Sequence, residues 1–353
     1  MNAPLLVHEY RSLHELAEQP SAWWDEVLGV VGFGQPPRLG RASIPVTGSM
    51  TPALGEDGEQ CEVWRVAGAS SGDIQMRVGA AGGVQFRHCG KYLFGSVTIA
   101  EQGFLADGAA SASAALRQAT ELAYKDNFGV LHAAGYANLI RVWNYLPEIN
   151  GDADGDERYR HFNSARLTAF RNSGRATEGC VPAASALGSA AGNPLSIYFL
   201  AARHQPTMIE NPRELSAYHY PARYGRHQPI FSRACVLGGA AGTNLFVSGT
   251  ASIVGHESIH PGDVSAQTQE ALVNIDALIQ EANRLGEAPP YTLDGLRYKV
   301  YVRHPADLPA IKTAMSERIG AAARAVYLHA DVCRQDLLVE IEATGRNSAG
   351  RPA

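Results

Sequence analysis

The sequence predicts an α+β fold that is built twice along the chain, each half being a mixed sheet with two helices packed on one face. Two observations lead to this prediction. Strand-like and helix-like segments follow the same order in both halves: strand, strand, helix, strand, helix, strand. Hydrophobic residues make up 45% of the 353 residues and charged residues 18%, which favours packed cores over disorder. Repeats of this size usually reflect one fold used twice, so we expect a duplication.

The second half shows this order most clearly. One helix is capped by Asp263 or Ser265 and runs to about Asn283, and another begins near Ala306. Both carry apolar residues at helical spacing, which predicts that one face of each helix packs on the sheet. The strand-like segments of this half are 229–236, 243–248, 296–302, 325–329 and 336–343.

The first half repeats the order. A helix is expected at about 111–133, and a second begins near Arg158 after a polar loop. The tripeptide FGS near residue 95 corresponds in position to VSG near residue 249. The offset between the halves is not constant, so the repeat is one of topology. The strand-like segments here are 61–66, 74–79, 84–94, 139–146 and 195–204. The third of these segments continues through LFGSVTI.

These segments divide the chain into three parts. Residues 1–210 are expected to form an N-terminal domain with an N-terminal extension, residues 211–228 a linker, and residues 229–353 a C-terminal domain. The linker region is rich in proline and tyrosine and cannot be helical throughout. A tyrosine-rich crossing between two domains is a natural wall for a ligand cleft.

Charge and cysteine content exclude several classes of protein. The net charge of −5 is unlike the basic surface of nucleic-acid binders, so we expect no nucleic-acid partner. The five cysteines are far apart and form no CxxC pair, which is typical of free thiols in a reducing compartment. No apolar run approaches the ~18 residues of a membrane span, and the N-terminus has no signal-peptide core. We therefore expect a cytoplasmic protein without a membrane partner, and the scattered histidines predict no metal site.

Several motifs carry a resemblance to known families. SGTASI, the helix that follows it, an alternating strand and the closing VEIEA make residues 230–345 resemble the RidA (YjgF) family. A tandem pair of such domains with ERYRHFNSAR, SAYHYP, FSRA and CRQDLLVEIEA resembles the chorismatase family over nearly the whole chain. The resemblance implies RidA/YjgF-like (chorismate mutase-like) domains, chorismate as the small-molecule substrate, and no cofactor or metal. RidA relatives suggest a homotrimer, but a fused pair of domains leaves a monomer open as well.

Glu340 is the candidate acid. Chorismate releases pyruvate when a proton reaches the terminal carbon of its enolpyruvyl ether, so the enzyme needs a well-placed acid. Alternation puts Glu340 on one strand face with Leu338 and Glu342, and periodicity alone favours a solvent-facing edge strand with two ordinary glutamates. The resemblance implies instead that Glu340 is the catalytic acid. Burial and the charge of Glu342 would then raise the pKa of Glu340 toward neutrality.

Two anchors are expected for the two carboxylates of chorismate. Arg324 resembles the carboxylate-binding arginine of RidA proteins, and a solvated helix-terminal arginine is the other interpretation. Tyr159 and Arg166 are about two helical turns apart on one helix face, and both match the chorismatase substrate-binding motif. Tyr218 and Tyr220 share one side if SAYHYP is extended, so one of them, with Tyr218 the first choice, is expected to donate to a carboxylate.

Two small residues bear on the product. The resemblance implies that Cys333 is typical of hydroxybenzoate formers, whereas hydrolases carry alanine there; a small packing residue is the other interpretation. Gly249 would leave room for the ring, or would simply serve a strand-end turn. We therefore expect conversion of chorismate to 3-hydroxybenzoate and pyruvate, with 4-hydroxybenzoate open as a further product. The alternatives are a chorismate hydrolase that yields a dihydroxycyclohexadiene carboxylate, and a RidA-like imine deaminase or metabolite-binding protein.

Overall fold

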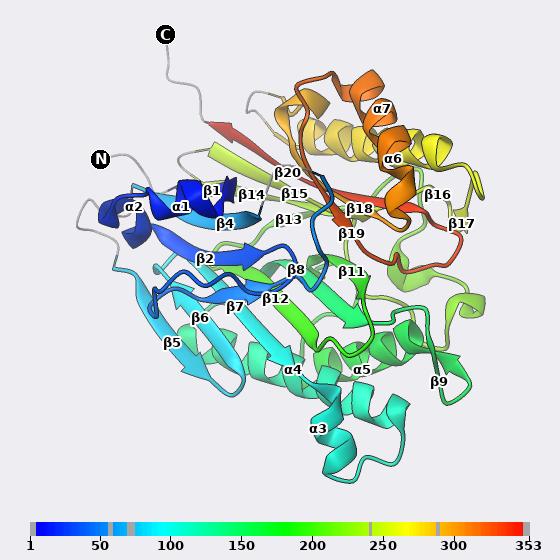
Figure 1. The fold of residues 1–353 in the computed structure, drawn as a ribbon, viewed down its shortest axis with the longest axis horizontal. Helices are drawn as coiled ribbons and strands as arrows, with labels where there is room; N and C mark the ends of the chain where they lie inside the picture. The colour runs from blue at the N-terminus through cyan, green and yellow to red at the C-terminus, as the bar shows by residue number, and fades with distance from the viewer. Residues whose placement is uncertain (1–4, 56–58, 69–74, 240–241, 287–289, 349–353) are drawn as a thin grey trace.

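Two six-stranded sheets form the centre of the molecule, and each carries its long helices on the outer side (Figure 1). The computed structural model describes residues 5–55, 59–68, 75–239, 242–286 and 290–348. The first sheet has the strand order β11-β8-β12-β7-β6-β5. Its strands are β5 (Arg77–Ala81), β6 (Val84–His88), β7 (Tyr92–Ile99), β8 (Asn138–Pro147), β11 (Ala183–Ser189) and β12 (Leu195–Ala202).

The second sheet repeats this arrangement strand for strand, with the order β19-β18-β20-β15-β14-β13. The parallel pairs, β8 with β11 and β18 with β19, occupy equivalent places in the two sheets. The same topology in both halves confirms the predicted duplication. The strands of this sheet are β13 (Thr207–Ile209), β14 (Ala234–Gly239), β15 (Gly242–Thr250), β18 (Arg297–Val302), β19 (Arg324–His329) and β20 (Val339–Ser348).

Two helices cover the outer face of each sheet, as the periodicity predicts. Helices α4 (Ala112–Ala134) and α5 (Arg158–Asn172) belong to the first half, and α6 (Val264–Arg284) and α7 (Leu308–Ile319) to the second. The side chain of Asp263 caps α6 by accepting a hydrogen bond from the backbone N–H of Ala266 in the first turn. This N–H has no carbonyl partner within the helix. None of the described helices combines the length and the apolar composition that a bilayer span requires.

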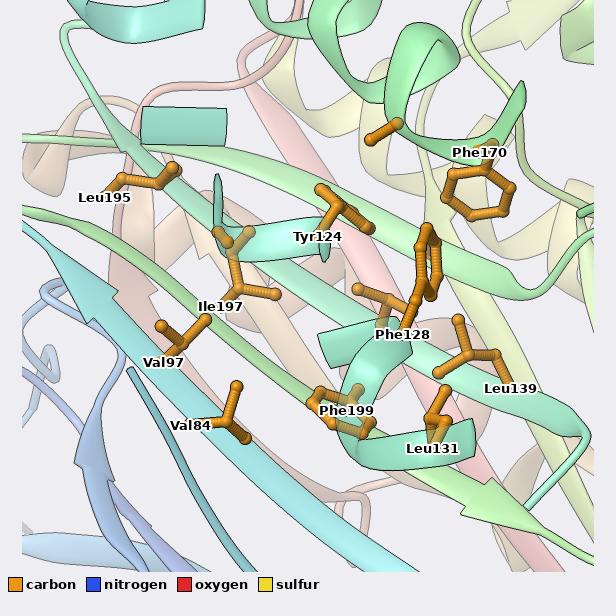
Figure 2. Packing of buried hydrophobic residues seen from close by; sticks show 14 of the residues in the cluster. Val84, Val97, Tyr124, Phe128, Leu131, Leu139, Phe170, Leu195, Ile197 and Phe199 are labelled. Carbon is orange, nitrogen blue, oxygen red and sulfur yellow. The ribbon is translucent and has the colours of Figure 1, made fainter. Parts of the chain in front are cut away.

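Aromatic residues dominate the packing between the first sheet and its helices (Figure 2). Tyr124, Phe128 and Phe170 project from α4 and α5, and the rings of Phe128 and Phe170 meet edge to face at 5.0 Å. Rings that meet in this way add specific geometry to the burial of apolar area. The strands contribute the other side of this core: Val84, Val97, Leu139, Leu195, Ile197 and Phe199.

An N-terminal sheet forms a third unit that the sequence does not predict. Its order, β1-β4-β2-β3, matches β7-β12-β8-β11 of the first sheet, and β2 and β3 are parallel like β8 and β11. Residues 61–66, expected to open the first sheet, lie in this one, because they pair with β1 and β2. Alternation identifies a strand but not its partners. The elements are β1 (Leu5–Ser12), α1 (Leu13–Ala17), α2 (Ser21–Asp25), β2 (Val27–Gly32), β3 (Val46–Gly48) and β4 (Gln60–Ala67).

The inner faces of the three sheets meet in one buried core. The unit formed by β1 to β4 therefore closes a central core that two sheets alone would leave open on one side. Each sheet contributes large side chains to it, among them Leu6 and Trp64, Trp143 and Tyr198, and Phe246 and Leu328.

The connection between the two larger sheets departs from the expected boundaries. Strand β13 lies before the expected domain boundary at residue 210, yet it pairs with β14, so the second sheet begins earlier. The linker is partly 3₁₀-helical, at η1 (Ala217–His219) and η2 (Ala222–Tyr224). The remaining short elements are α3 (Glu101–Ala106), β9 (Asp152–Ala153), β10 (Asp156–Glu157), β16 (Ile253–Val254), β17 (Glu257–Ser258), η3 (Leu293–Gly295) and η4 (Pro305–Asp307).

Candidate active site

A cavity of about 880 Å³ lies where the two larger units meet. The first half contributes the loop after β8, the start of α5 and the edge strand β11, and the second half contributes the end of β15 and the segment from Cys333 to Glu340. This volume is in the range of small-molecule sites. Six of the eight residues selected from the sequence line it: Tyr159, Arg166, Tyr220, Gly249, Cys333 and Glu340.

Glu340 lies on β20 opposite Tyr301 of β18, and only 4% of its surface is exposed. Burial, reinforced by the charge of Glu342, raises its pKa to about 8. A solvent-facing edge strand, which periodicity alone favours, is therefore excluded. A carboxyl group with this pKa holds its proton at neutral pH and is suited to general acid catalysis.

Glu342, two residues further on the same strand face, is ionised. Burial by itself would raise its pKa, but Lys299 and Arg141 outweigh burial and hold the pKa below its ordinary value. Lys299 Nζ lies 2.9 Å from Glu342 Oε1, and Arg141 Nη2 lies 2.7 Å from Glu342 Oε2. Glu340 is thus protonated and Glu342 is ionised at neutral pH. Enzymes often use such a difference in environment to give two neighbouring carboxyl groups different roles.

Gly249 lies directly against the Glu340 carboxyl group. A Cβ atom at this position would lie 1.8 Å from Glu340 Oε1, closer than any real contact. Glycine is required here because the carboxyl occupies the space that a side chain would fill. Gly249 therefore makes room for the acid, and its predicted role beside the substrate ring stays a prediction.

Cys333 lies beside the acid in the same cavity. Its Sγ donates a weak hydrogen bond to Glu340 Oε2 at 4.0 Å. Burial and the nearby Glu340 raise the pKa of the thiol to about 12, so the residue remains a neutral thiol. A neutral thiol is a poor nucleophile, which leaves Cys333 a role in shaping the cavity.

Arg166 lines the cavity and has one side-chain nitrogen without a partner among the described residues. Its Nε donates to the hydroxyl of Tyr124 at 2.7 Å and its Nη1 donates to the carbonyl of Ile230 at 2.5 Å. Its Nη2 is buried and has no hydrogen-bond partner among the described residues. Tyr159 lines the same cavity from the start of the helix, in agreement with the predicted shared face.

Arg334 presents a second unused donor, and the sequence analysis missed it. Its Nη1 donates to the carbonyl of His256 at 2.9 Å and to Ser258 Oγ at 3.2 Å, while its buried Nη2 has no partner in the described part of the chain. The guanidinium stacks over the ring of Tyr224 at 4.1 Å. Its position directly after Cys333 in the motif CRQDLLVEIEA was the available signal.

Arg233, in the motif FSRA, is a further arginine at the cavity that was not predicted from the sequence. Its Nη1 pairs with Glu214 at 2.9 Å, and its Nη2 donates to the hydroxyl of Tyr220 at 2.7 Å. The charge of Arg233 is therefore largely neutralised within the protein. Arg233 also lines the cavity beside Tyr220, and its buried Nε has no hydrogen-bond partner in the described part of the chain.

Two of the selected residues lie outside the cavity. Arg324 is the exposed first residue of β19, and His329 is the last. At ~3.3 Å per residue, these two residues are about 16 Å apart along the strand. The cavity is lined by the loop that follows His329, so it lies far from Arg324. Tyr218 packs against the core of the first half and meets the ring of His219 at 4.7 Å. The segment around Tyr218 is 3₁₀-helical and not extended, so Tyr218 and Tyr220 do not share one side.

The arrangement suits a small dianion with an acid-sensitive bond. One protonated carboxyl group lines the cavity together with four arginines that each have a buried nitrogen without a hydrogen-bond partner among the described residues: Arg160, Arg166, Arg233 and Arg334. Guanidinium groups bind carboxylates with both charge and direction. Among the residues that the structure describes, no three His, Cys, Asp or Glu side chains are grouped as metal ligands would be.

Comparison with known proteins identifies the family. Residues 62–201 match the family model of the chorismatase FkbO/Hyg5-like N-terminal domain. A 3-hydroxybenzoate synthase from Streptomyces hygroscopicus is 39% identical over 76% of this chain and 78% of its own length. A chorismatase from Streptomyces rapamycinicus is 39% identical over 81% and 82%. A chorismatase crystal structure aligns over 98% of this chain and 99% of its own, with 32% identity and a TM-score of 0.83. The protein is thus a member of the chorismatase family.

Proposed function

We propose that the protein converts chorismate to 3-hydroxybenzoate and pyruvate. The observation that carries this proposal is the protonated Glu340 carboxyl in one cavity with the free donors of Arg166 and Arg334. Chorismate has two carboxylates, which guanidinium groups bind, and one acid-labile enolpyruvyl ether, which a protonated carboxyl group can attack with its proton. The names of the two sequence relatives agree with this reaction.

The proposed reaction begins with proton transfer from Glu340 to the methylene carbon of the enolpyruvyl group. The resulting oxocarbenium ion is stabilised by its own ether oxygen, and cleavage of the bond between this oxygen and the ring releases pyruvate. As pyruvate leaves, the ring hydroxyl oxygen gives up its proton and bonds to the neighbouring ring carbon. The bond from this oxygen to its original carbon then opens and the oxygen takes a proton back. Loss of the hydrogen on the carbon that now bears the oxygen restores aromaticity. That proton returns to the Glu340 carboxylate, so the acid is regenerated and no water is consumed.

Arg166 and Arg334 are proposed to hold the two carboxylates, with Tyr159 and Tyr220 completing the walls. Fixing both ends of the substrate would place the methylene carbon against Glu340, and such positioning lowers the entropic barrier of the transfer. Cys333 is proposed to keep water from the ring while the ring hydroxyl reacts. Arg324 has no part in this proposal, because it lies outside the cavity.

The proposal extends to a monomer in the cytoplasm. All five cysteines are unpaired, which favours a reducing compartment. Three units of related topology surround one core within a single chain, so the arrangement leaves little need for further copies.

The deciding experiment is incubation with chorismate, a coupled assay for pyruvate and chromatography of the ring product. Release of pyruvate with 3-hydroxybenzoate as the main ring product is the expected result. A dihydroxycyclohexadiene carboxylate in its place would identify a hydrolase. Absence of pyruvate, with turnover of imine substrates, would point to the RidA-like alternative.

A further inference from the structure

A second carboxylate lies behind the cavity wall on the same face of β20 as Glu340. Beside its two cationic partners, Glu342 accepts hydrogen bonds from Trp143 Nε1 at 2.7 Å and from Ser185 Oγ at 2.8 Å. Its partners come from the strands β8, β11 and β18, so the carboxylate is held from several directions. Glu342 is therefore a fixed anion and not a group that can turn toward solvent.

The cations around Glu342 are fixed in turn. Lys299 is 1% exposed, and its Nζ donates to Glu62 Oε2 at 2.8 Å and to the hydroxyl of Tyr198 at 3.0 Å. Arg141 Nη2 also donates to Ser185 Oγ at 2.5 Å. Each charged group is paired and hydrogen-bonded, which is the condition for keeping charges in a protein interior.

Stability gives no sufficient reason for this network. Replacing a buried ion network by well-packed apolar residues is often neutral or stabilising. The network also reaches the cavity wall, because Ser185 Oγ accepts a hydrogen bond from the backbone N–H of Gly249 at 2.9 Å. Gly249 is the residue against which the Glu340 carboxyl lies. The fixed anion is thus connected to the acid through two short steps.

Glu340 is surrounded by charges of both signs. Burial is the main influence that keeps Glu340 protonated and Glu342 adds to it, whereas the nearby arginines favour the ionised form. The titratable and charged groups that face it from the packed elements are Arg141 on β8, Arg233 before β14, Arg303 after β18, Tyr159 on α5, Cys333 in the loop before β20, and Glu342 on β20 itself.

We propose that Glu342 is a positioning residue: the anion that Arg141 and Lys299 fix beside Glu340 keeps the catalytic carboxyl group protonated between turnovers. This inference rests on the proposed role of Glu340 as the acid. This role accounts for the buried network, because a fixed anion favours the return of the ring proton to Glu340 after each cycle. Burial and this anion together hold the proton on Glu340 against the surrounding arginines, and loss of the anion would leave burial alone to oppose them.

The test is the pH dependence of kcat in Glu342→Gln, a neutral residue of the same shape. Loss of the anion lowers the pKa of Glu340, so the high-pH limb of the profile is expected to move down by about one pH unit or more. Turnover at pH 6 should stay within a few-fold of the parent, and the ratio of turnover at pH 6 to that at pH 8.5 should rise about tenfold. Circular dichroism and thermal melting confirm that the variant is folded.

Glu62→Gln is the matched control. It removes the other buried carboxylate that pairs with Lys299 but does not share the strand face of Glu340. It is expected to lower the melting temperature while leaving the high-pH limb in place. A uniform loss of turnover at every pH in Glu342→Gln, or an equal shift in Glu62→Gln, would overturn the positioning role.

If Glu342→Gln does not fold, infrared spectroscopy can still test whether Glu340 is protonated. The infrared difference spectrum between the parent and Glu340→Gln at neutral pH should contain the C=O band of a protonated carboxyl group, and a carboxylate band there would refute the inference. The two proposals also fail separately. Full activity of Glu340→Gln would remove the proposed function, whereas an inactive Glu340→Gln with an unshifted Glu342→Gln profile would remove only the inference about Glu342.

Discussion

At Glu340, burial and the charge of Glu342 act in the same direction, and together they give a carboxyl group that carries its proton at neutral pH. We expect Glu340→Gln to keep the fold but to lose turnover by ~10²–10⁴-fold, because the amide cannot supply the proton. In the parent, activity should be present below a pH of about 8 and should fall as the pH rises through this value. The measurement is kcat from pyruvate release across the pH range. Turnover of Glu340→Gln within a few-fold of the parent would remove Glu340 from its role.

A second prediction concerns Arg166 and Arg334, whose Nη2 atoms have no hydrogen-bond partner among the described residues. Arg166→Ala and Arg334→Ala should each weaken chorismate binding by about tenfold to a hundredfold, since charge-assisted hydrogen bonds contribute ~1.5–3 kcal/mol. Arg324→Ala is the matched control, and its KM should equal that of the parent because Arg324 is exposed and outside the cavity. Equal effects at Arg324 and Arg334 would contradict this assignment. Steady-state kinetics with chorismate give the three values.

Cys333 is expected to affect the ring product more than the release of pyruvate. A neutral, weakly polar side chain beside the acid excludes water better than a strong hydrogen-bonding group. Cys333→Ala should still release pyruvate, while the 3-hydroxybenzoate fraction falls and the dihydrodiol or 4-hydroxybenzoate fraction rises. Chromatography beside the pyruvate assay measures both. An unchanged product ratio would make Cys333 a packing residue only.

At the scale of the element, the end of β15 and the strand β20 must approach closely for the site to exist. Gly249→Ala should keep the fold, because the atom that a Cβ displaces is the end of the Glu340 side chain and not backbone. The displaced carboxyl should lower turnover by about tenfold and reduce the 3-hydroxybenzoate share. Gly238→Ala on β14 is the control, since a Cβ there meets nothing within 4 Å. The two variants are compared by melting temperature, kcat and product ratio, and equal behaviour would refute the contact.

At the scale of the whole molecule, three units share one core, and the site lies between the two units that contain the six-stranded sheets. We expect a monomer in solution with the mass of one chain, 37.7 kDa. Light scattering after size exclusion, over about a hundredfold range of concentration, tests this prediction, because an oligomer would change mass with dilution. A constant mass of three chains would show instead that the trimer suggested by RidA proteins is retained.

The sequence by itself determined the four long helices, most strands of the two larger sheets and the duplication. Strands and helices such as β18 and α6 follow from the local alternation and spacing of apolar residues, which depend on near neighbours along the chain. The motif LLVEIE and the family resemblance also identified Glu340, and the Tyr159–Arg166 spacing gave two residues of the cavity.

Only the tertiary structure decided the partners of those elements. Whether residues 61–66 join the first sheet or a third one depends on hydrogen bonds to strands distant in sequence. Whether Glu340 faces solvent or a core depends on the sheets packed against β20. Arg334 lines the cavity and Arg324 does not, because the loop that carries Arg334 reaches the cavity and the start of β19 does not. Periodicity describes the face of one element, whereas burial, charge pairing and cavity lining arise only when several elements meet.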